Sequence, residues 1–321
     1  MIVILFTGGT IAMRNDPSGA LPSLSANEIL EATRGIEEIT GVETEEWGKF
    51  PGPHMTVDRM WALRNRIREH LARPEVTGVV VTHGTDTLEE SAYLVARSLP
   101  AEKPIVFTGA MRTVSDLGWD GPANLLEAVR VAASPATRGF GAMVVISGQI
   151  FSALDATKTN THLLDAFESP GVGPLGVLDE GELIVRREIP LMPPILKPSE
   201  LAAPVDIIFV AAGSDARLLD ASRECARGVV IAAMGRGNVP PDMVPAIERW
   251  IADDKPVVLT SRTQGGRVGQ TYGYFGGGKT LEQIGAIFGG SRRAQQARID
   301  LMLALGAGMD MDEIRSMFRD N

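Results

Sequence analysis

The sequence predicts an α/β fold with two domains: a larger N-terminal domain around a parallel sheet of the flavodoxin or Rossmann type, and a smaller C-terminal domain that is also Rossmann-like. Three observations predict it. The 321 residues exceed the ~250 that a single hydrophobic core usually supports. Short apolar runs alternate with segments of helical period, as in a parallel sheet covered by helices. A proline-rich stretch then interrupts both patterns.

Four apolar runs are the expected strands of the first domain. They are continuously apolar, which is typical of strands buried on both faces of a sheet. They span residues 2–6, 78–82, 104–108 and 142–147.

Helix starts are readable between these runs. Ser25 with Glu28, and Thr87 with Glu90, form the pattern of a capping box, and Pro122 stands at the start of a predicted helix over 123–133. After Thr56, an apolar stripe predicts a further helix; it consists of Met60, Leu63, Ile67 and Leu71.

The domain boundary is predicted from proline density. Pro190, Pro193, Pro194, Pro198 and Pro204 exclude both periodicities and indicate an extended linker. We therefore expect a catalytic domain over 1–189, a linker over 190–204 and a second domain over 205–321. In the second domain we expect strands over 205–211, 229–234 and 256–260, a helix from 240–241 and a last helix over 292–305.

Charge and cysteine content exclude several classes of function. Lys and Arg total 31 against 40 Asp and Glu, a net charge of −9, which disfavours nucleic acid and anionic membranes as partners. Cys225 is the single cysteine, so no disulfide forms within the chain. The apolar run at 1–7 is too short for a signal peptide, and no run reaches the ~18 residues of a membrane span. We expect a cytoplasmic protein.

Polar residues follow three of the predicted strands. They form the segments 7–12 (TGGTIA), 83–87 (HGTDT) and 109–112 (GAMR). Ligands bind beyond the carboxyl ends of the strands in open α/β sheets. Thr10, Thr85 and Asp86 are therefore expected at one rim of the sheet, although each turn taken singly is more often structural and Thr87 is expected to cap a helix.

A threonine hydroxyl becomes a useful nucleophile only when a neighbouring base takes its proton. Lys158 follows the strand predicted over 142–147 and can reach the same rim. A solvated loop lysine is the alternative that spacing alone favours.

The motifs resemble those of the bacterial-type L-asparaginase family. Besides the three segments above, the chain has DGPAN at 120–124, KTNT at 158–161, GRGN at 235–238 and SR at 261–262, in the family's order and spacing. The resemblance runs from the first strand to the last helix. The first two segments are highly specific, since two independent motifs fall at matching strand ends.

The resemblance implies hydrolysis of L-asparagine to L-aspartate and ammonia through an acyl-enzyme. Thr10 would be the first nucleophile, and Thr85, Lys158 and Asp86 would form a second relay of hydroxyl, base and acid. Asp86 would also grip the substrate's α-amino group. Backbone N–H groups at the glycine turns would hold the oxyanion, and we expect substrate contacts from Gly9 and Ala110. The family has no cofactor.

The resemblance also implies a homotetramer, a dimer of dimers in which one subunit completes its neighbour's site. Asn238 matches the residue that is donated in this way. The partner's acidic residue of some relatives has no match near 276–278.

Two positions depart from the family's pattern. The segment 13–23, after the first strand, lacks the tyrosine of many relatives, and the three tyrosines are Tyr93, Tyr272 and Tyr274. Pro53 stands where relatives place a serine for the α-carboxylate, and His54 is the expected substitute.

Other chemistry is disfavoured. Residues 273–280 satisfy the P-loop pattern, but the preceding segment is not strand-like, which argues against nucleotide binding. The four histidines lack metal-ligand spacing, and we expect no metal. We expect His70 to be solvated and His83 to give hydrogen-bonded support.

Three alternatives stay open. Within the class, the chain could be a glutaminase or broader amidase, or a subunit that supplies ammonia to a partner. The alternative from another class is a non-catalytic module that binds a small molecule or nucleotide.

Overall fold

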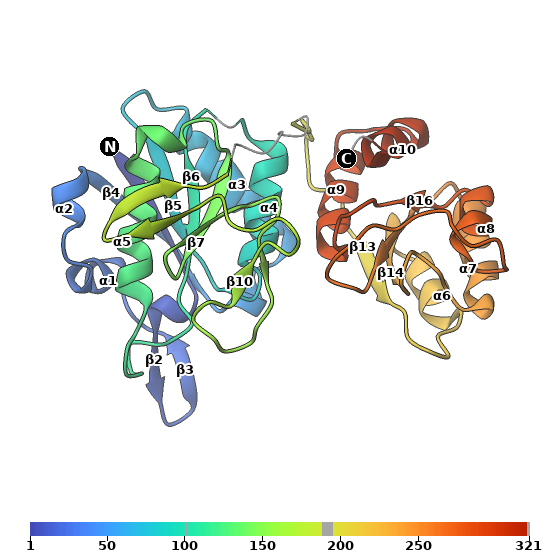
Figure 1. The fold of residues 1–321 in the computed structure, drawn as a ribbon, viewed down its shortest axis with the longest axis horizontal. Helices are drawn as coiled ribbons and strands as arrows, with labels where there is room; N and C mark the ends of the chain where they lie inside the picture. Colours follow the sequence, from blue (N-terminus) through green and yellow to red (C-terminus); the bar gives the residue numbers. More distant parts are fainter. Residues whose placement is uncertain (101, 188–194, 320–321) are drawn as a thin grey trace. The chain divides into compact units, whose positions relative to one another are not determined.

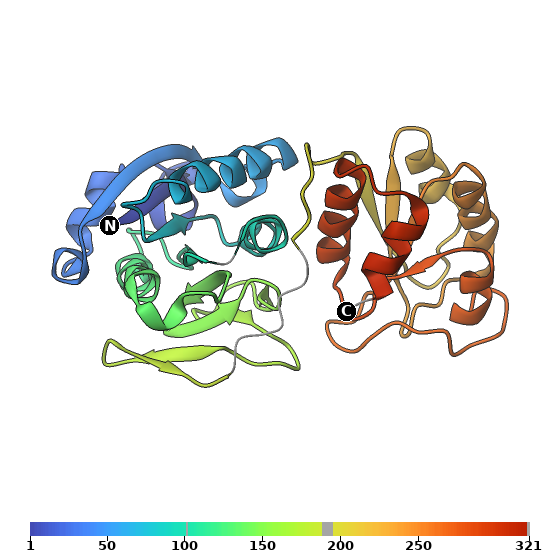
Figure 2. The same ribbon diagram turned by 90° about the horizontal axis from the view of Figure 1, so that it is seen from above.

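The computed structural model describes residues 1–100, 102–187 and 195–319, and it divides into two compact units, Met1–Ile195 and Leu196–Asn321 (Figures 1 and 2). The predicted domain end at 189 and the first linker residues, 190–194, lie outside the described residues. Both units are α/β, as the sequence predicts.

The first unit is built on an eight-stranded sheet in the order β12-β11-β8-β7-β6-β5-β1-β4. Its parallel part holds β1 (Ile2–Gly8), β4 (Val42–Phe50), β5 (Gly78–Thr82), β6 (Ile105–Thr108) and β7 (Ala142–Ile146). Its antiparallel part holds β8 (Gln149–Ser152), β11 (Gly176–Asp179) and β12 (Glu182–Val185). The four predicted strands are β1, β5, β6 and β7.

The remaining strands of this sheet escaped prediction for physical reasons. Strand β4 lies at the sheet edge and carries Glu43, Glu45 and Glu46, so it lacks the continuous apolar run of a central strand. Strand β7 reverses into β8 at Ser147 and Gly148, which have φ of 52° and 73°. This tight hairpin makes the sheet mixed rather than purely parallel.

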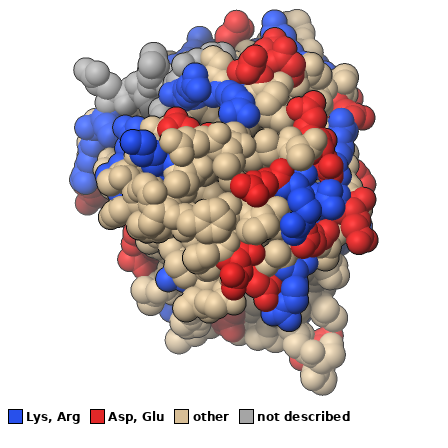
Figure 3. All heavy atoms as spheres, turned by 90° about the vertical axis from the view of Figure 1, so that its right-hand side faces the viewer, with Lys and Arg blue, Asp and Glu red and all other residues tan. Residues whose placement is uncertain are grey.

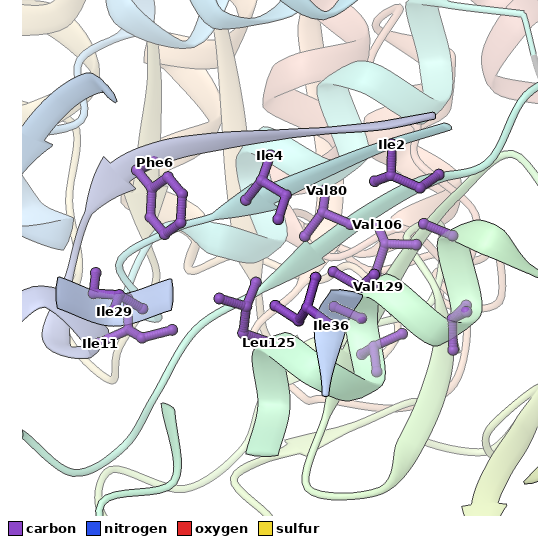
Figure 4. Close-up of a cluster of buried hydrophobic side chains, with 14 of the residues drawn as sticks. Ile2, Ile4, Phe6, Ile11, Ile29, Ile36, Val80, Val106, Leu125 and Val129 are labelled. Carbon is purple, nitrogen blue, oxygen red and sulfur yellow. The ribbon is translucent and has the colours of Figure 1, made fainter. Parts of the chain in front are cut away.

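Helices cover the sheet. They are α1 (Ala26–Ala32), α2 (Ile36–Ile39), α3 (Val57–Leu71), α4 (Leu88–Ser98) and α5 (Gly121–Ala133). Ile2, Ile4 and Phe6 of β1 point to one face, where they join Leu125 and Val129 of α5 in a buried cluster (Figure 4). The cluster fixes α5 against the strands whose ends carry the site.

Three predicted helix starts are confirmed, since α1 follows Ser25, α3 follows Thr56 and α5 has Pro122 in its first turn, and the fourth differs in its cap. Ser25 forms the predicted capping box, with Glu28 N donating to Ser25 Oγ at 3.3 Å and Ser25 N donating to Glu28 Oε2 at 2.8 Å. The capping box at Thr87 was wrong. Its hydroxyl donates to Gly52 O at 2.8 Å, so it ties the loop after β5 to the loop after β4.

The prediction of a solvated His70 was also wrong. The ring is buried against β4, where its Nε2 lies 2.8 Å from Glu45 Oε2. On its other side, Nδ1 lies 3.2 Å from Arg73 Nη1, so the ring lies between a carboxylate of the strand and a guanidinium that follows the helix.

The second unit has a four-stranded parallel sheet in the order β13-β14-β15-β16. The strands are β13 (Val205–Phe209), β14 (Gly228–Ala233), β15 (Val257–Ser261) and β16 (Ile287–Phe288). The helices are α6 (Arg217–Arg223), α7 (Val244–Ala252), α8 (Gly278–Gln283), α9 (Ala294–Gly306) and α10 (Met311–Arg319). Trp250 of α7 is fully buried in its core.

Candidate active site

The loops after four neighbouring strands of the first unit meet at backbone contact. A Cβ on Gly9 would lie 2.5 Å from Gly84 N, and one on Gly84 would lie 2.5 Å from Gly52 Cα. A Cβ on Gly109 would lie 2.6 Å from His83 O. Because real Cβ atoms do not come this close, only glycine permits these loops to converge.

Thr10 follows the first of these glycines. Gly9 has φ of 79°, a conformation that favours glycine, and it starts a short 3-10 helix over Thr10–Ala12. Ile11 and Ala12 are buried and anchor this turn, while Thr10 is half-buried at the rim. The segment therefore presents its threonine at the carboxyl end of β1.

Lys158 forms hydrogen bonds with both Thr85 and Asp86, the two residues after Gly84. Its Nζ donates to Thr85 Oγ1 at 2.8 Å and to Asp86 Oδ1 at 2.7 Å. Thr85 is buried, the lysine side chain is 17% exposed and the aspartate side chain is 56% exposed. The hydroxyl thus sits in a low-dielectric position, with its amine and carboxylate partners toward solvent.

His83 lies behind Thr85 and is fully buried. Its Nδ1 lies 2.9 Å from Gly84 O and its Nε2 lies 2.9 Å from Ser91 Oγ. Burial lowers the pKa of His83 to about 4, so the ring is neutral at pH 7 and donates through Nδ1 while it accepts the Ser91 hydroxyl. This is the structural support that its sequence position indicated.

Asp120 and Asn124 hold the loop after β6. The Asp120 carboxylate accepts from Met111 N and Arg112 N, both at 2.9 Å. Asn124 donates to Gly109 O at 2.9 Å and accepts from Ser147 N at 2.9 Å. The sequence showed these residues only as a motif at a helix start. Their contacts explain the motif, because they fix the loop that contains the buried Ala110.

His54 and Asn238 are not part of the lysine cluster. His54 is exposed in a 3-10 helix over Gly52–His54, two residues after the glycine that packs against Asp86. Asn238 belongs to the second unit, where its Oδ1 accepts from Gly278 N at 3.2 Å. Its predicted role in a neighbouring subunit's site stays a prediction.

A β-hairpin follows the 3-10 helix that begins at Thr10. It consists of β2 (Met13–Asp16) and β3 (Gly19–Pro22), most of whose residues are exposed. The loop after Arg112 holds it, since Val114 N donates to Met13 O at 3.1 Å and Asn15 N donates to Ser115 Oγ at 3.0 Å. This hairpin is the segment that lacks the family's tyrosine.

The P-loop-like segment at 273–280 does not form an anion cradle. No strand directly precedes it within the described residues, and α8 has only six residues. Its donors are used internally: Lys279 N bonds to Tyr272 O, and the Thr280 hydroxyl bonds to Tyr274 O and Gly277 O. Nucleotide binding is therefore not supported. Across the described ranges, no group of His, Cys, Asp and Glu is arranged to hold a metal ion.

Gly84→Ala should lower the free energy of unfolding by ~1–3 kcal/mol, because the new methyl group would meet the Gly52 backbone and force two loops apart. Urea denaturation measures this. Gly41→Ala is the control, since nothing lies within 4 Å of its Cβ position and no left-handed φ is required there. Equal stability of the two variants would contradict the packing argument.

His83 should make stability depend on pH between about 4 and 6.5. In this range the unfolded state binds a proton that the folded state rejects, so the free energy of unfolding should fall as pH falls, by up to ~1.4 kcal/mol per unit. Urea midpoints at pH 7, 6 and 5 test it against His83→Gln. If both proteins lost stability equally, His83 would not be the titrating group.

The chain is similar to known proteins over both of its domains. Residues 1–191 match the family "Asparaginase, N-terminal" and residues 204–318 match the "Glutaminase/Asparaginase C-terminal domain". A probable L-asparaginase of Deinococcus radiodurans is 40% identical over 320 residues, which cover 99% of this chain and 96% of that one. An L-asparaginase of Bacillus licheniformis is 32% identical over 95% of both chains.

A solved structure has the same fold. The crystal structure of a probable cytoplasmic L-asparaginase from Campylobacter jejuni superposes with a TM-score of 0.88 at 28% identity, covering 99% of this chain and 98% of that chain. With both domains matched in order and close relatives aligned end to end, the chain belongs to the asparaginase family of amidohydrolases.

Proposed function

We propose that the chain hydrolyses L-asparagine to L-aspartate and ammonia, with Thr10 as the nucleophile and Thr85, Lys158 and Asp86 as a second relay. Family membership and the names of the relatives support the reaction. The observation that carries the mechanism is the Lys158 amine, which lies 2.8 Å from Thr85 Oγ1 and 2.7 Å from Asp86 Oδ1.

The reaction begins at the rim of the sheet. The Thr10 hydroxyl attacks the side-chain amide carbon and loses its proton, and collapse of the tetrahedral intermediate releases ammonia and leaves an acyl-enzyme. Water then attacks the ester and regenerates the threonine. Backbone N–H groups at the glycine turns after β1 and β6 are suited to hold the oxyanion, since fixed donors need no reorganisation, and each is typically worth ~3 kcal/mol.

In the second step, the attacking water gives a proton to Thr85 while the Thr85 hydroxyl passes its own proton to Lys158, and the lysine returns a proton to the departing Thr10 oxygen. Thr85 can pass a proton to Lys158 only when the amine is neutral, and a neighbouring carboxylate then stabilises the ammonium that forms. Asp86 meets this requirement through its contact with Nζ. Its side chain is 56% exposed, so it also remains able to bind the α-amino group of the substrate.

Recognition of the α-carboxylate is assigned to His54. Pro53 has neither a hydroxyl nor an N–H to offer. The exposed imidazole of His54 stands in the next position of the same 3-10 turn, whose Gly52 packs against Asp86. Glutamine is the competing substrate, because the matched C-terminal domain is described for both glutaminases and asparaginases.

The proposal extends to the cellular location and the oligomeric state of the protein. We assign the protein to the cytoplasm and to a homotetramer in which Asn238 reaches a neighbouring subunit's site, with no cofactor. The face of the second unit that carries α7 and α8 has an area without charged side chains at its centre (Figure 3). The segment before α8 exposes Tyr272, Tyr274 and Phe275 at 42%, 55% and 56%, which suits a subunit contact. Among the described helices, none has the length and apolar composition of a bilayer span.

Thr10→Ala, Thr85→Val and Lys158→Met should each lower turnover of L-asparagine ~100-fold or more, because each removes a nucleophile or a proton carrier. A coupled ammonia assay with L-Asn, L-Gln and D-Asn measures it. Thr40→Val, at the end of α2, is the control and should leave turnover unchanged. A variant with near-normal turnover would lose its assigned role, and a wild-type protein that releases no ammonia would reject the function.

A further inference from the structure

Both the side-chain amine and the main-chain N–H of Lys158 bond to residues of the segment 85–89. Its Nζ bonds to Thr85 and Asp86, which precede α4, and its main-chain N–H donates to Glu89 Oε2 at 2.6 Å. Glu89 lies in the first turn of α4. The lysine is therefore fixed to the start of the helix whose preceding loop carries the hydroxyl it serves.

The main-chain N–H is available because of the local strand geometry. Lys158 lies in β9 (Thr157–Lys158), which pairs in antiparallel register with β10 (Phe167–Glu168). Thr159 N donates to Ala166 O at 2.8 Å, and successive N–H groups of a strand point to opposite edges. The N–H of Lys158 thus points away from β10, toward α4.

Glu89 is well suited to accept this bond. A carboxylate in the first turn of a helix is stabilised by the helix dipole, and a hydrogen bond to a charged acceptor is stronger than one to a neutral group. Thr85 lies four residues before Glu89, in the hydrogen-bonded turn that leads into α4, where Thr87 N donates to Gly84 O at 3.4 Å. The contact therefore sets the distance between the lysine backbone and the hydroxyl that its amine must reach.

We propose that Glu89 is a positioning residue for the reaction: by binding the main-chain N–H of Lys158, it sets the place of the Lys158 amine relative to Thr85. The inference rests on the proposed function. Glu89 acts through Lys158 and takes no proton from the substrate. Displacement of a reacting group by about 1 Å can cost ~100-fold in rate, so one lost anchor suffices to slow the relay.

The test compares three substitutions. Glu89→Ala removes the acceptor, and Glu89→Asp keeps the charge but is one methylene too short to reach the N–H. Both should lower kcat for L-asparagine ~10–100-fold, while KM stays within ~3-fold because the substrate's own contacts remain. Glu89→Gln retains an acceptor oxygen of the same reach and should restore kcat to within ~5-fold of wild type.

The matched control is Glu168→Ala, which removes an exposed carboxylate from β10 of the same hairpin. It should leave kcat unchanged. Melting temperatures of all variants identify any that do not fold, and Glu89→Asp keeps the favourable charge at the helix start if Glu89→Ala is unstable.

A double-mutant cycle separates positioning from a general defect. In the Lys158→Met background, Glu89→Ala should lower kcat no further, because its effect passes through the lysine amine. A multiplicative loss would overturn the inference, and so would wild-type kcat in folded Glu89→Ala. An inactive wild-type protein would instead reject the proposed function.

Discussion

The site depends on the contact between glycine backbones at the carboxyl ends of three neighbouring strands, β5, β1 and β4. Gly9 packs against Gly84, and Gly84 packs against Gly52, at separations that leave no room for a Cβ. Since the loops after β1, β4 and β5 are in direct backbone contact, the residues that follow them have little freedom to move apart. Thr10 follows Gly9 and Thr85 follows Gly84, so close main-chain packing sets the positions of both threonine residues.

A polar layer of two buried residues, His83 and Asn124, and the half-buried Asp120 supports this backbone contact. His83, Asp120 and Asn124 bond mainly to main-chain groups of the loops, and their own polar atoms are satisfied in return. An unsatisfied polar group in this place would cost ~1–3 kcal/mol. The hydrogen bonds of the layer therefore favour the observed arrangement of the loops over arrangements that would break them. The groups proposed to meet the substrate, Asp86 and His54, lie outside the layer and are exposed. The site therefore combines tightly packed loops with exposed side chains that can contact a substrate.

The sequence predicted the parts of this arrangement that local patterns encode. Continuous apolar runs identified β1, β5, β6 and β7, and the glycine turns after them identified the rim. Spacing alone favoured a solvated Lys158, because its partner Thr85 is 73 residues away, and only the family resemblance pointed to the pair. Long-range pairing also explains the errors. His70 of α3 is buried because Glu45, 25 residues earlier on β4, is its partner, and no local pattern shows this contact. Thr87 stands in the sequence pattern of a helix cap, but its hydroxyl donates a hydrogen bond to the carbonyl oxygen of Gly52 in another loop.

The hairpin after Thr10 places a constraint on the first step of the proposed reaction. Segment 13–22 contains no tyrosine, and Tyr93, the one tyrosine in the sequence of the first unit, is buried in α4. The amine of Lys158 is one base at the same rim of the sheet, and it is already bonded to Thr85. If one base serves both hydroxyls, the two proton transfers must occur in sequence, and the lysine must return its first proton before it can accept the second. Departure of ammonia from the tetrahedral intermediate requires that proton, so the release of the first product resets the base for the attack of water on the acyl-enzyme.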